Sequence, residues 1–113
     1  MDNWSYEELK EYIHEDIAEF MVDGLNIRQV SSRVQVEYKN SIGNNQVEKA
    51  IIYLVLCDEG IKNELLREDI KIDTINLLDH IDNDLLSKEL LPSELEKFIF
   101  YKEKIIKNLR GDD

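Results

Sequence analysis

The strongest constraint on this chain is a run of eight apolar residues at positions 50–57, which reads Ala-Ile-Ile-Tyr-Leu-Val-Leu-Cys. Shortly before the run, Asn45 and Glu48 have the three-residue spacing of an N-terminal helix cap. A helix that is apolar all round must be covered by protein on every side. The sequence therefore predicts a buried central helix over residues 46–59, with other helices packed around it.

The chain contains few residues that break helices. Four glycines and one proline among 113 residues favour helices with short connections over the many turns of a β-sandwich or barrel. The apolar content of 42% is high enough for a packed core, and the length is that of one ordinary domain. We therefore expect an all-α fold, a compact bundle of about five helices, in a single helical domain over residues 1–113.

Capping signals define the start of the first helix. Ser5 and Glu8 form a capping box, and Trp4 precedes it as a hydrophobic staple. Gly24 is a typical helix stop. These signals predict a helix over residues 6–23. After the first helix we expect a second one from Asn26 to about Lys39, followed by a loop over residues 40–44. Beyond the central helix we expect a helix that ends near Asn83, and residues 85–91 stay unassigned. A last helix should begin at Pro92, with Ser93 and Glu96 as its capping box.

Five acidic residues follow one another at four-residue spacing along the first predicted helix: Glu7, Glu11, Glu15, Glu19 and Asp23. At about 100° per residue they lie opposite the apolar positions and should face outward. Like charges at this spacing each cost about 0.2–0.5 kcal/mol. Two interpretations stay open: a face for a basic partner, with Tyr12 as an aromatic anchor, or a solubilising face of an acidic protein.

The net charge of −11 disfavours several classes of partner. It repels nucleic-acid phosphates and anionic lipid headgroups, so we expect neither direct nucleic-acid binding nor membrane binding. Cys57 lies within the apolar run and is expected to pack in the core of a protein from a reducing compartment. The start of the chain lacks the regions of a signal peptide, and the expected location is the cytoplasm.

Signals for catalysis or metal binding are weak. Glu11 and His14 have the spacing of a ligand pair in di-iron bundles, but that chemistry needs the motif twice and the second copy is missing. An exposed histidine is the better interpretation. The chain also has no Gly-rich phosphate loop and no nucleophile motif. We therefore expect no enzyme activity, no cofactor and no metal ion.

Three segments together carry a family resemblance: Trp4-Ser5-Tyr6-Glu7-Glu8-Leu9, then Gly24-Leu25-Asn26, then the apolar helix followed by Asp58-Glu59. Across Trp4 to Ile81 the chain resembles the small all-helical immunity proteins of bacterial polymorphic toxin systems, in particular their third numbered class. It departs from that family after the central helix. Family members tend to have an alanine and then a glycine-leucine turn where this chain has residues 56–61.

The resemblance implies a non-catalytic protein that binds and neutralises one cognate toxin domain, often a nuclease. A nuclease surface that holds phosphates is basic, which agrees with an acidic helix face as the contact surface. On this hypothesis the candidate partner-binding residues are Glu7, Glu11, Tyr12, Glu15, Asp16, Glu19, Asp23, Asp58 and Glu59. The alternative is an acidic protein-interaction module or regulator of another kind.

Overall fold

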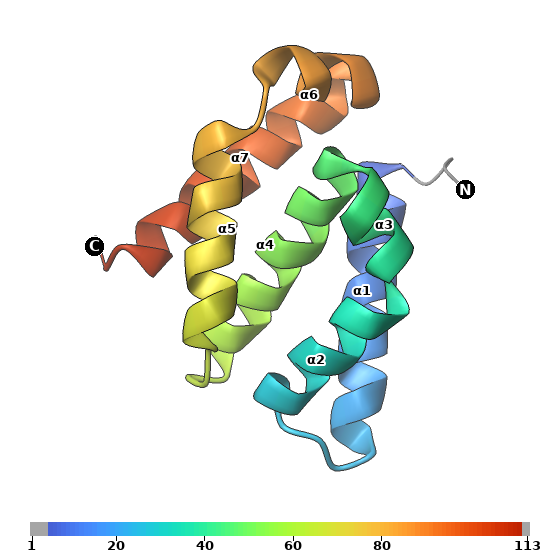
Figure 1. Cartoon of the computed structure of the whole chain (residues 1–113), viewed down its shortest axis with the longest axis vertical. Coiled ribbons are helices and arrows are strands. Elements are labelled where there is room, and N and C mark those ends of the chain that lie inside the picture. The colour runs from blue at the N-terminus through green and yellow to red at the C-terminus, as the bar shows by residue number, and fades with distance from the viewer. Residues whose placement is uncertain (1–4, 112–113) are drawn as a thin grey trace.

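A computed structural model describes residues 5–111, and within this range the chain forms seven helices and no strand (Figure 1). The helices are α1 (Tyr6–Val22), α2 (Ile27–Glu37), α3 (Lys39–Asn44), α4 (Gln46–Lys62), α5 (Glu68–His80), α6 (Asn83–Glu89) and α7 (Pro92–Leu109). The all-α class is confirmed. The expected number of about five helices was too low, because two short helices join the longer ones.

The first short helix, α3, replaces the loop expected over residues 40–44. Its turn is closed by backbone hydrogen bonds from the Ile42 amide to the Tyr38 carbonyl and from the Asn45 amide to the Ser41 carbonyl, each 3.0 Å. Ile42 also packs against the core. Residues such as Gly43 have low helix propensity and indicated a loop. The packing of Ile42 against the core stabilises the helix despite this low propensity.

The second short helix, α6, forms in the segment that the sequence left unassigned. The Asp82 side chain accepts a hydrogen bond from the Asp84 amide at 2.9 Å, which caps the helix, and Leu86 is buried. The last helix begins at Pro92, so the expected Ser93 cap was wrong. Instead the Glu94 carboxylate accepts a hydrogen bond from the Leu91 amide at 3.0 Å. The expected staple residue Trp4 lies outside the described residues.

Helix α4 is the centre of the bundle, as the apolar run predicted. Residues 50–58 are all buried, and α4 packs against each of the other helices. In the view of Figure 1, α1, α2 and α3 lie on one side of it and α5 and α7 on the other. No helix within residues 5–111 has the length and hydropathy to cross a bilayer.

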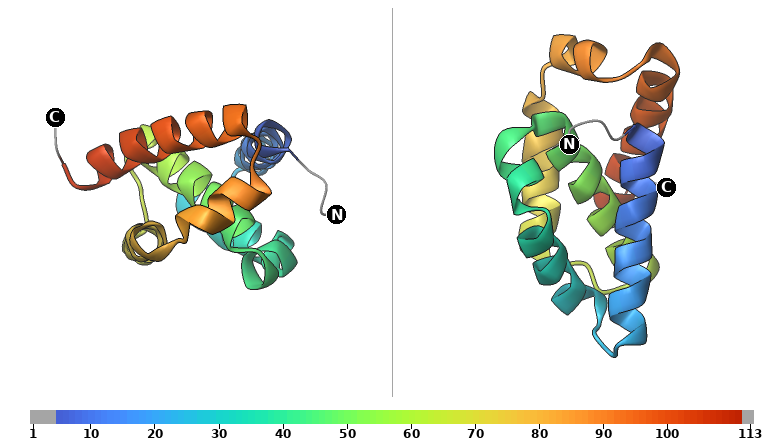
Figure 2. Two further views of the ribbon diagram at one scale, coloured as in Figure 1. Left: turned by 90° about the horizontal axis from the view of Figure 1, so that it is seen from above. Right: turned by 90° about the vertical axis from the view of Figure 1, so that its right-hand side faces the viewer.

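Helices α1 and α7 lie side by side although they are the first and last helices of the chain (Figure 2). Two contacts join their N-terminal ends. The Tyr6 amide donates to the Glu94 carboxylate at 3.0 Å, and the Lys97 ammonium lies 3.0 Å from the Glu7 carboxylate. This pairing decides which side of α1 is left open to solvent.

The close approach of α4 to the segment before α5 gives a test of the packing. A Cβ atom at Gly60 would lie 3.1 Å from the Leu66 Cα atom and 2.7 Å from its Cδ1 atom, whereas one at Gly43 would meet nothing within 4 Å. We expect Gly60→Ala to lower the free energy of unfolding by about 1–3 kcal/mol. Gly43→Ala should raise it by up to about 1 kcal/mol, because alanine favours the helix. Urea unfolding of the two variants measures both values, and an equal effect would contradict the described packing.

Candidate interaction surface on α1

The acidic row of α1 faces solvent, as its spacing predicted. Its five members, Glu7, Glu11, Glu15, Glu19 and Asp23, are all exposed. The apolar positions of the same helix, Tyr6, Leu9, Ile13 and Ile17, are buried. The predicted capping box is also confirmed, with reciprocal hydrogen bonds of 3.1 Å between Ser5 and Glu8. Local sequence signals therefore define both the start and the orientation of this helix.

The row does not run straight along the helix. Each four-residue step turns it by about 40°, so the row crosses the outer face of α1 from one neighbouring helix to the other. At the α7 end, Glu7 forms the ion pair with Lys97. Towards the other end, Glu19 lies near Glu37 of α2, and the negative charge of Glu19 helps to raise the pKa of Glu37. Within residues 5–111, Glu11, Glu15, Glu19 and Asp23 form no ion pair.

One residue of α2, Glu37, extends the acidic surface of α1. The Tyr38 hydroxyl donates a hydrogen bond to the Asp16 carboxylate at 2.5 Å, which fixes Asp16 at the junction of the two helices. Desolvation, followed by the nearby Asp16 and Glu19 carboxylates, raises the pKa of Glu37 above its ordinary value. We call the acidic side chains of this region the acidic patch: Glu11, Glu15, Asp16, Glu19, Asp23 and Glu37, of which Asp16 is half-buried and the others are exposed.

Glu37 was not among the residues that the sequence singled out. It lies on a different helix from the acidic row, and only the packing of α2 on α1 brings it to Asp16. The patch is not uniformly negative, since the Arg33 guanidinium of α2 lies 5.7 Å from the centre of the Phe20 ring on α1. Tyr12 is 44% exposed, so part of an aromatic side chain faces solvent on the same helix as the acids.

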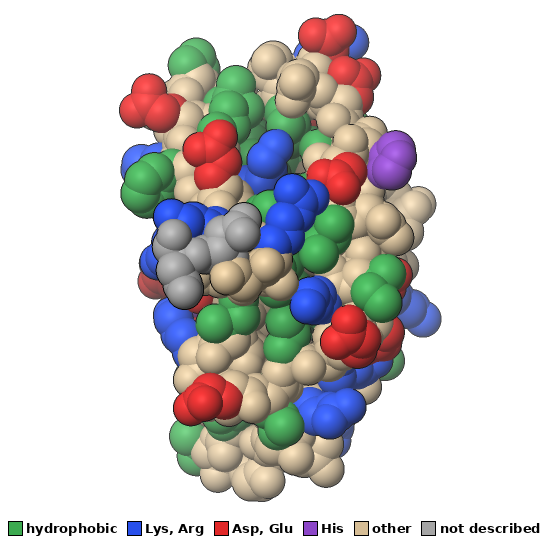
Figure 3. Space-filling view, turned by 90° about the vertical axis from the view of Figure 1, so that its left-hand side faces the viewer, with side chains coloured by type: hydrophobic (Ala, Val, Ile, Leu, Met, Phe, Trp, Pro, Cys, Tyr) green, Lys and Arg blue, Asp and Glu red, His purple; other side chains and the backbone are tan. Residues whose placement is uncertain are grey.

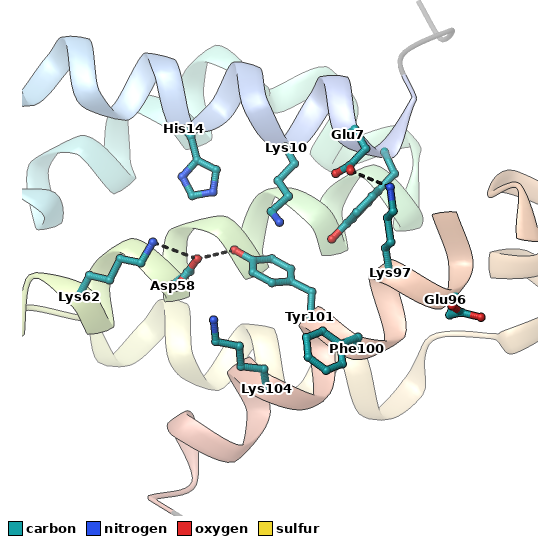
Figure 4. Close-up of a pocket in the computed structure, with 11 residues that line it drawn as sticks. Glu7, Lys10, His14, Asp58, Lys62, Glu96, Lys97, Phe100, Tyr101 and Lys104 are labelled. Atoms are coloured by element: carbon teal, nitrogen blue, oxygen red, sulfur yellow. Dashed lines mark hydrogen bonds and ion pairs between the residues drawn. The ribbon is translucent and has the colours of Figure 1, made fainter. Parts of the chain in front are cut away.

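Two acidic candidates from α4 are placed differently. Asp58 is only 8% exposed, and its carboxylate accepts a hydrogen bond from the Tyr101 hydroxyl at 2.8 Å. It also lies 3.6 Å from the Lys62 ammonium (Figure 4). Asp58 therefore joins α4 to α7, and only a small part of its side chain is exposed. Sequence reasoning placed it at the end of the central helix without knowing which side it faced.

Glu59, the second of these candidates, forms a hydrogen bond with the Nδ1 atom of His14 at 2.8 Å. His14 is thus half-buried between α1 and α4, and the expectation of an exposed histidine was wrong. Its partner is Glu59, whereas the sequence motif had paired it with Glu11. The interaction joins the two helices, and it leaves only part of the Glu59 side chain accessible.

Cys57 lies in the core, as expected. Its thiol donates to the Thr74 hydroxyl at 3.2 Å, and burial raises the pKa of the thiol to about 11. Because the thiolate is the reactive form, this environment disfavours nucleophilic or metal chemistry at Cys57. The residue contributes packing between α4 and α5.

The other side of the molecule has a different charge distribution. Figure 3 shows lysine and arginine side chains mixed with acidic and hydrophobic ones on the side of α5 and α7. Lys102, Lys107 and Arg110 lie there beside Asp79 and Glu103, and Arg110 is 3.4 Å from Asp79. The largest excess of negative charge lies on α1, which has six acidic residues and one lysine, whereas α2 has two arginines and one glutamate.

Comparison with known proteins gives one family. The family model described as immunity protein Imm3 matches residues 2–111. The match continues beyond Ile81, where the resemblance seen in the sequence ended, through the whole of α7. No curated protein and no solved structure matches the chain significantly.

The crowding of carboxylates at Glu37 predicts a pH-dependent stability. A raised pKa means that the folded protein binds this proton more tightly than the unfolded chain, so Glu37 lowers stability as the pH rises through its folded-state pKa. We expect Glu37→Gln to raise the midpoint of thermal unfolding at neutral pH. The gain should vanish about one unit below the ordinary glutamate pKa of about 4.3, where the carboxyl is protonated in both states.

The control for this experiment is Glu103→Gln, which removes an exposed charge on α7. It separates a general effect of net charge from the local effect at Asp16 and Glu19. Equal gains from the two variants, or a gain for Glu37→Gln that is the same at both pH values, would show that the carboxylates of α1 and α2 do not interact.

Proposed function

The chain belongs to the Imm3 family of immunity proteins, and we propose that it binds a cognate bacterial toxin domain, a basic nuclease, through the acidic patch of α1 and α2. The observation that carries the function is the family match over residues 2–111. The role of the acidic patch rests on its charge and exposure. Neutralisation is by binding, in the cytoplasm, with no catalytic step.

Charge complementarity supports the acidic patch as the contact surface. A nuclease holds the phosphates of its substrate on a basic surface, and a row of carboxylates is attracted to that surface. Four members of the row have no ion-pair partner within the described part of the chain. Their charge is therefore not neutralised locally and is available to a partner. Such complementarity raises the association rate, which suits a protein that must capture a toxin quickly.

The energetic cost of the row also supports a role in binding. Four like-charged pairs at four-residue spacing weaken α1 by about 0.2–0.5 kcal/mol each. Glu19 and Asp23 lie near the C-terminal end of the helix, where acids oppose the helix dipole. Lysines at some of these positions would make the helix more stable. The acids therefore cost stability of the fold, and a role in binding would account for their presence.

Tyr12 supplies the apolar part of this surface. Interface energy is usually concentrated in a few aromatic or arginine side chains surrounded by polar contacts. Tyr12 is 44% exposed in the free protein and comes from the same helix as the acidic row. We propose that it becomes buried against the toxin, while the carboxylates around it steer and orient the partner.

The second candidate function is an acidic interaction module or regulator that binds a different basic protein. The exposed acidic patch favours it equally well, because charge and exposure do not specify the identity of the partner. The two candidates differ in the genetic context and in the effect on growth.

Co-expression with the product of the gene directly upstream tests the function. We expect the upstream protein to arrest growth when it is expressed alone, and this chain to restore growth and co-purify with it. Failure of both rescue and co-purification would exclude that protein as the cognate toxin and would favour the interaction module.

The acidic patch is tested by reversing charge in the middle of the row. Glu11→Lys combined with Glu15→Lys should weaken toxin binding at least tenfold at low salt. The loss should shrink as salt increases, because the screening length falls from about 10 Å at 0.1 M to about 3 Å at 1 M. The free energy of unfolding should stay equal or rise slightly, since the new lysines relieve repulsion along α1. Isothermal titration calorimetry at several salt concentrations measures the affinity.

The matched control reverses two exposed acids elsewhere, Asp73→Lys on α5 with Glu103→Lys on α7. It produces the same change in net charge and should alter the affinity much less. If both double variants lose affinity to the same degree, net charge alone drives binding and the acidic patch is not the interface.

A further inference from the structure

A groove of about 580 Å³ lies between α1, α4 and α7, on the other flank of α1 from α2 (Figure 4). Four lysines line it, contributed by all three helices: Lys10, Lys62, Lys97 and Lys104. Within a chain of net charge −11, this gathering of positive side chains is the reverse of the general pattern. We call it the lysine groove.

Two of the four lysines have carboxylate partners within the structure. Lys62 lies 3.6 Å from Asp58, and Lys97 lies 3.0 Å from Glu7. Lys10 instead lies over the Tyr101 ring, 4.0 Å from its centre. Figure 4 shows Lys10 entering the groove from α1 and Lys104 from α7. Neither of these two forms an ion pair within residues 5–111. Three carboxylates also line the groove: Glu7 and Asp58, which pair with lysines, and the exposed Glu96. The four lysines therefore exceed the acids by one.

Tyr6 provides a second and independent observation. It lines the lysine groove and is only 2% exposed. Its hydroxyl is the buried side-chain polar atom for which the described residues supply no hydrogen-bond partner. Buried polar groups are satisfied in the great majority of cases, and an unsatisfied one destabilises the fold. Because the hydroxyl is covered in the free protein, a ligand group reaches it only when side chains of the groove move aside, and a hydrogen bond to that group would then satisfy it.

The rim of the groove is apolar on one side. Phe100 of α7 lines the groove and is 73% exposed. An exposed aromatic ring next to unpaired ammonium groups suits a ligand that carries both negative charge and an apolar side chain. The groove is open to solvent and is bounded by helices along its length, a shape that fits a segment of polypeptide.

We propose that the lysine groove binds an acidic peptide segment of the toxin, a proposal that rests on the function proposed above. Carboxylates of the segment pair with Lys10 and Lys104, a polar group meets the Tyr6 hydroxyl, and an apolar side chain packs on Phe100. Because α1 carries the acidic patch on one flank and the lysine groove on the other, one toxin domain contacts both across a helix about 10 Å wide.

Opposite charges on the two flanks of α1 give the complex a fixed orientation. A toxin with a basic surface alone satisfies the acidic patch, but places like charges or unpaired groups against the lysine groove. Such mismatches discriminate against related partners, in addition to the attraction that favours the cognate one. The lysine groove therefore selects the cognate toxin, whereas the acidic patch attracts it.

The first test reverses the two unpaired lysines. Lys10→Glu combined with Lys104→Glu should weaken toxin binding at least tenfold. The matched control, Lys71→Glu with Lys88→Glu, makes the same change in net charge on α5 and α6 and should change the affinity less than threefold. Equal affinities for the groove variant and the unmodified chain would overturn the proposal.

The second test separates binding from folding. Tyr6→Phe removes the unpartnered hydroxyl and keeps the ring that packs edge-on against Phe98. We expect thermal unfolding at an equal or higher temperature together with toxin binding that is weaker by severalfold. A purely structural role for the hydroxyl predicts a lower unfolding temperature, and unchanged affinity would contradict its contact with the toxin.

A third measurement identifies the class of ligand without the toxin. Titration of the isotope-labelled chain with a short poly-glutamate peptide that ends in phenylalanine should shift the backbone amide signals of α1 and α7 around the groove. Inorganic phosphate at the same charge concentration should produce much smaller shifts. Equal shifts with phosphate would replace the peptide segment with a small-anion site and so overturn the proposal.

These experiments distinguish the groove from the function on which it rests. If the unmodified chain does not bind the toxin, both proposals fail together. A different result is possible when the unmodified chain does bind the toxin. If the acidic-patch variant then loses affinity but the groove variants do not, the immunity function stands and only the lysine groove is rejected.

Discussion

The all-round burial of α4 determines the arrangement of the other helices. Residues 50–58 of this helix are buried, so protein must cover it in every direction. Three helices before it and three after it provide that cover. Because the first and last helices both pack against α4, α1 and α7 become neighbours. They are joined by the Glu7–Lys97 ion pair and by the hydrogen bond from the Tyr6 amide to Glu94. The contact between α1 and α7 forms the lysine groove and leaves the acidic side of α1 exposed.

Helix α1 has three different environments around its circumference. One side contributes core residues such as Ile13 and Ile17. The side next to α2 carries acids, where Tyr38 holds Asp16. The side next to α7 faces the lysine groove, where Lys10 lies over Tyr101. A single helix therefore separates two surfaces of opposite character, and its packing in the core keeps their relative orientation constant. This separation allows one partner to be both attracted and selected.

Local signals predicted the features that depend on neighbouring residues in the sequence. The Ser5 capping box and the exposure of the row at Glu11 and Glu15 followed from helical spacing. Contacts between distant residues were not predictable in the same way. His14 was expected in solvent but meets Glu59, and Asp58, a surface candidate, hydrogen-bonds Tyr101. Both pairings depend on how helices pack, which spacing within one helix does not specify.

The sequence by itself determined the helical class, the buried central helix and an outward acidic row, because periodicity and capping act within one or two helical turns. The tertiary structure decided which flank of the row stays open. It brought Glu37 to the acidic patch and collected Lys10 and Lys104 in one groove. It also left the Tyr6 hydroxyl buried beside them. Residues far apart in the chain meet only through packing on α4, and this long-range packing created the surfaces proposed to bind a partner.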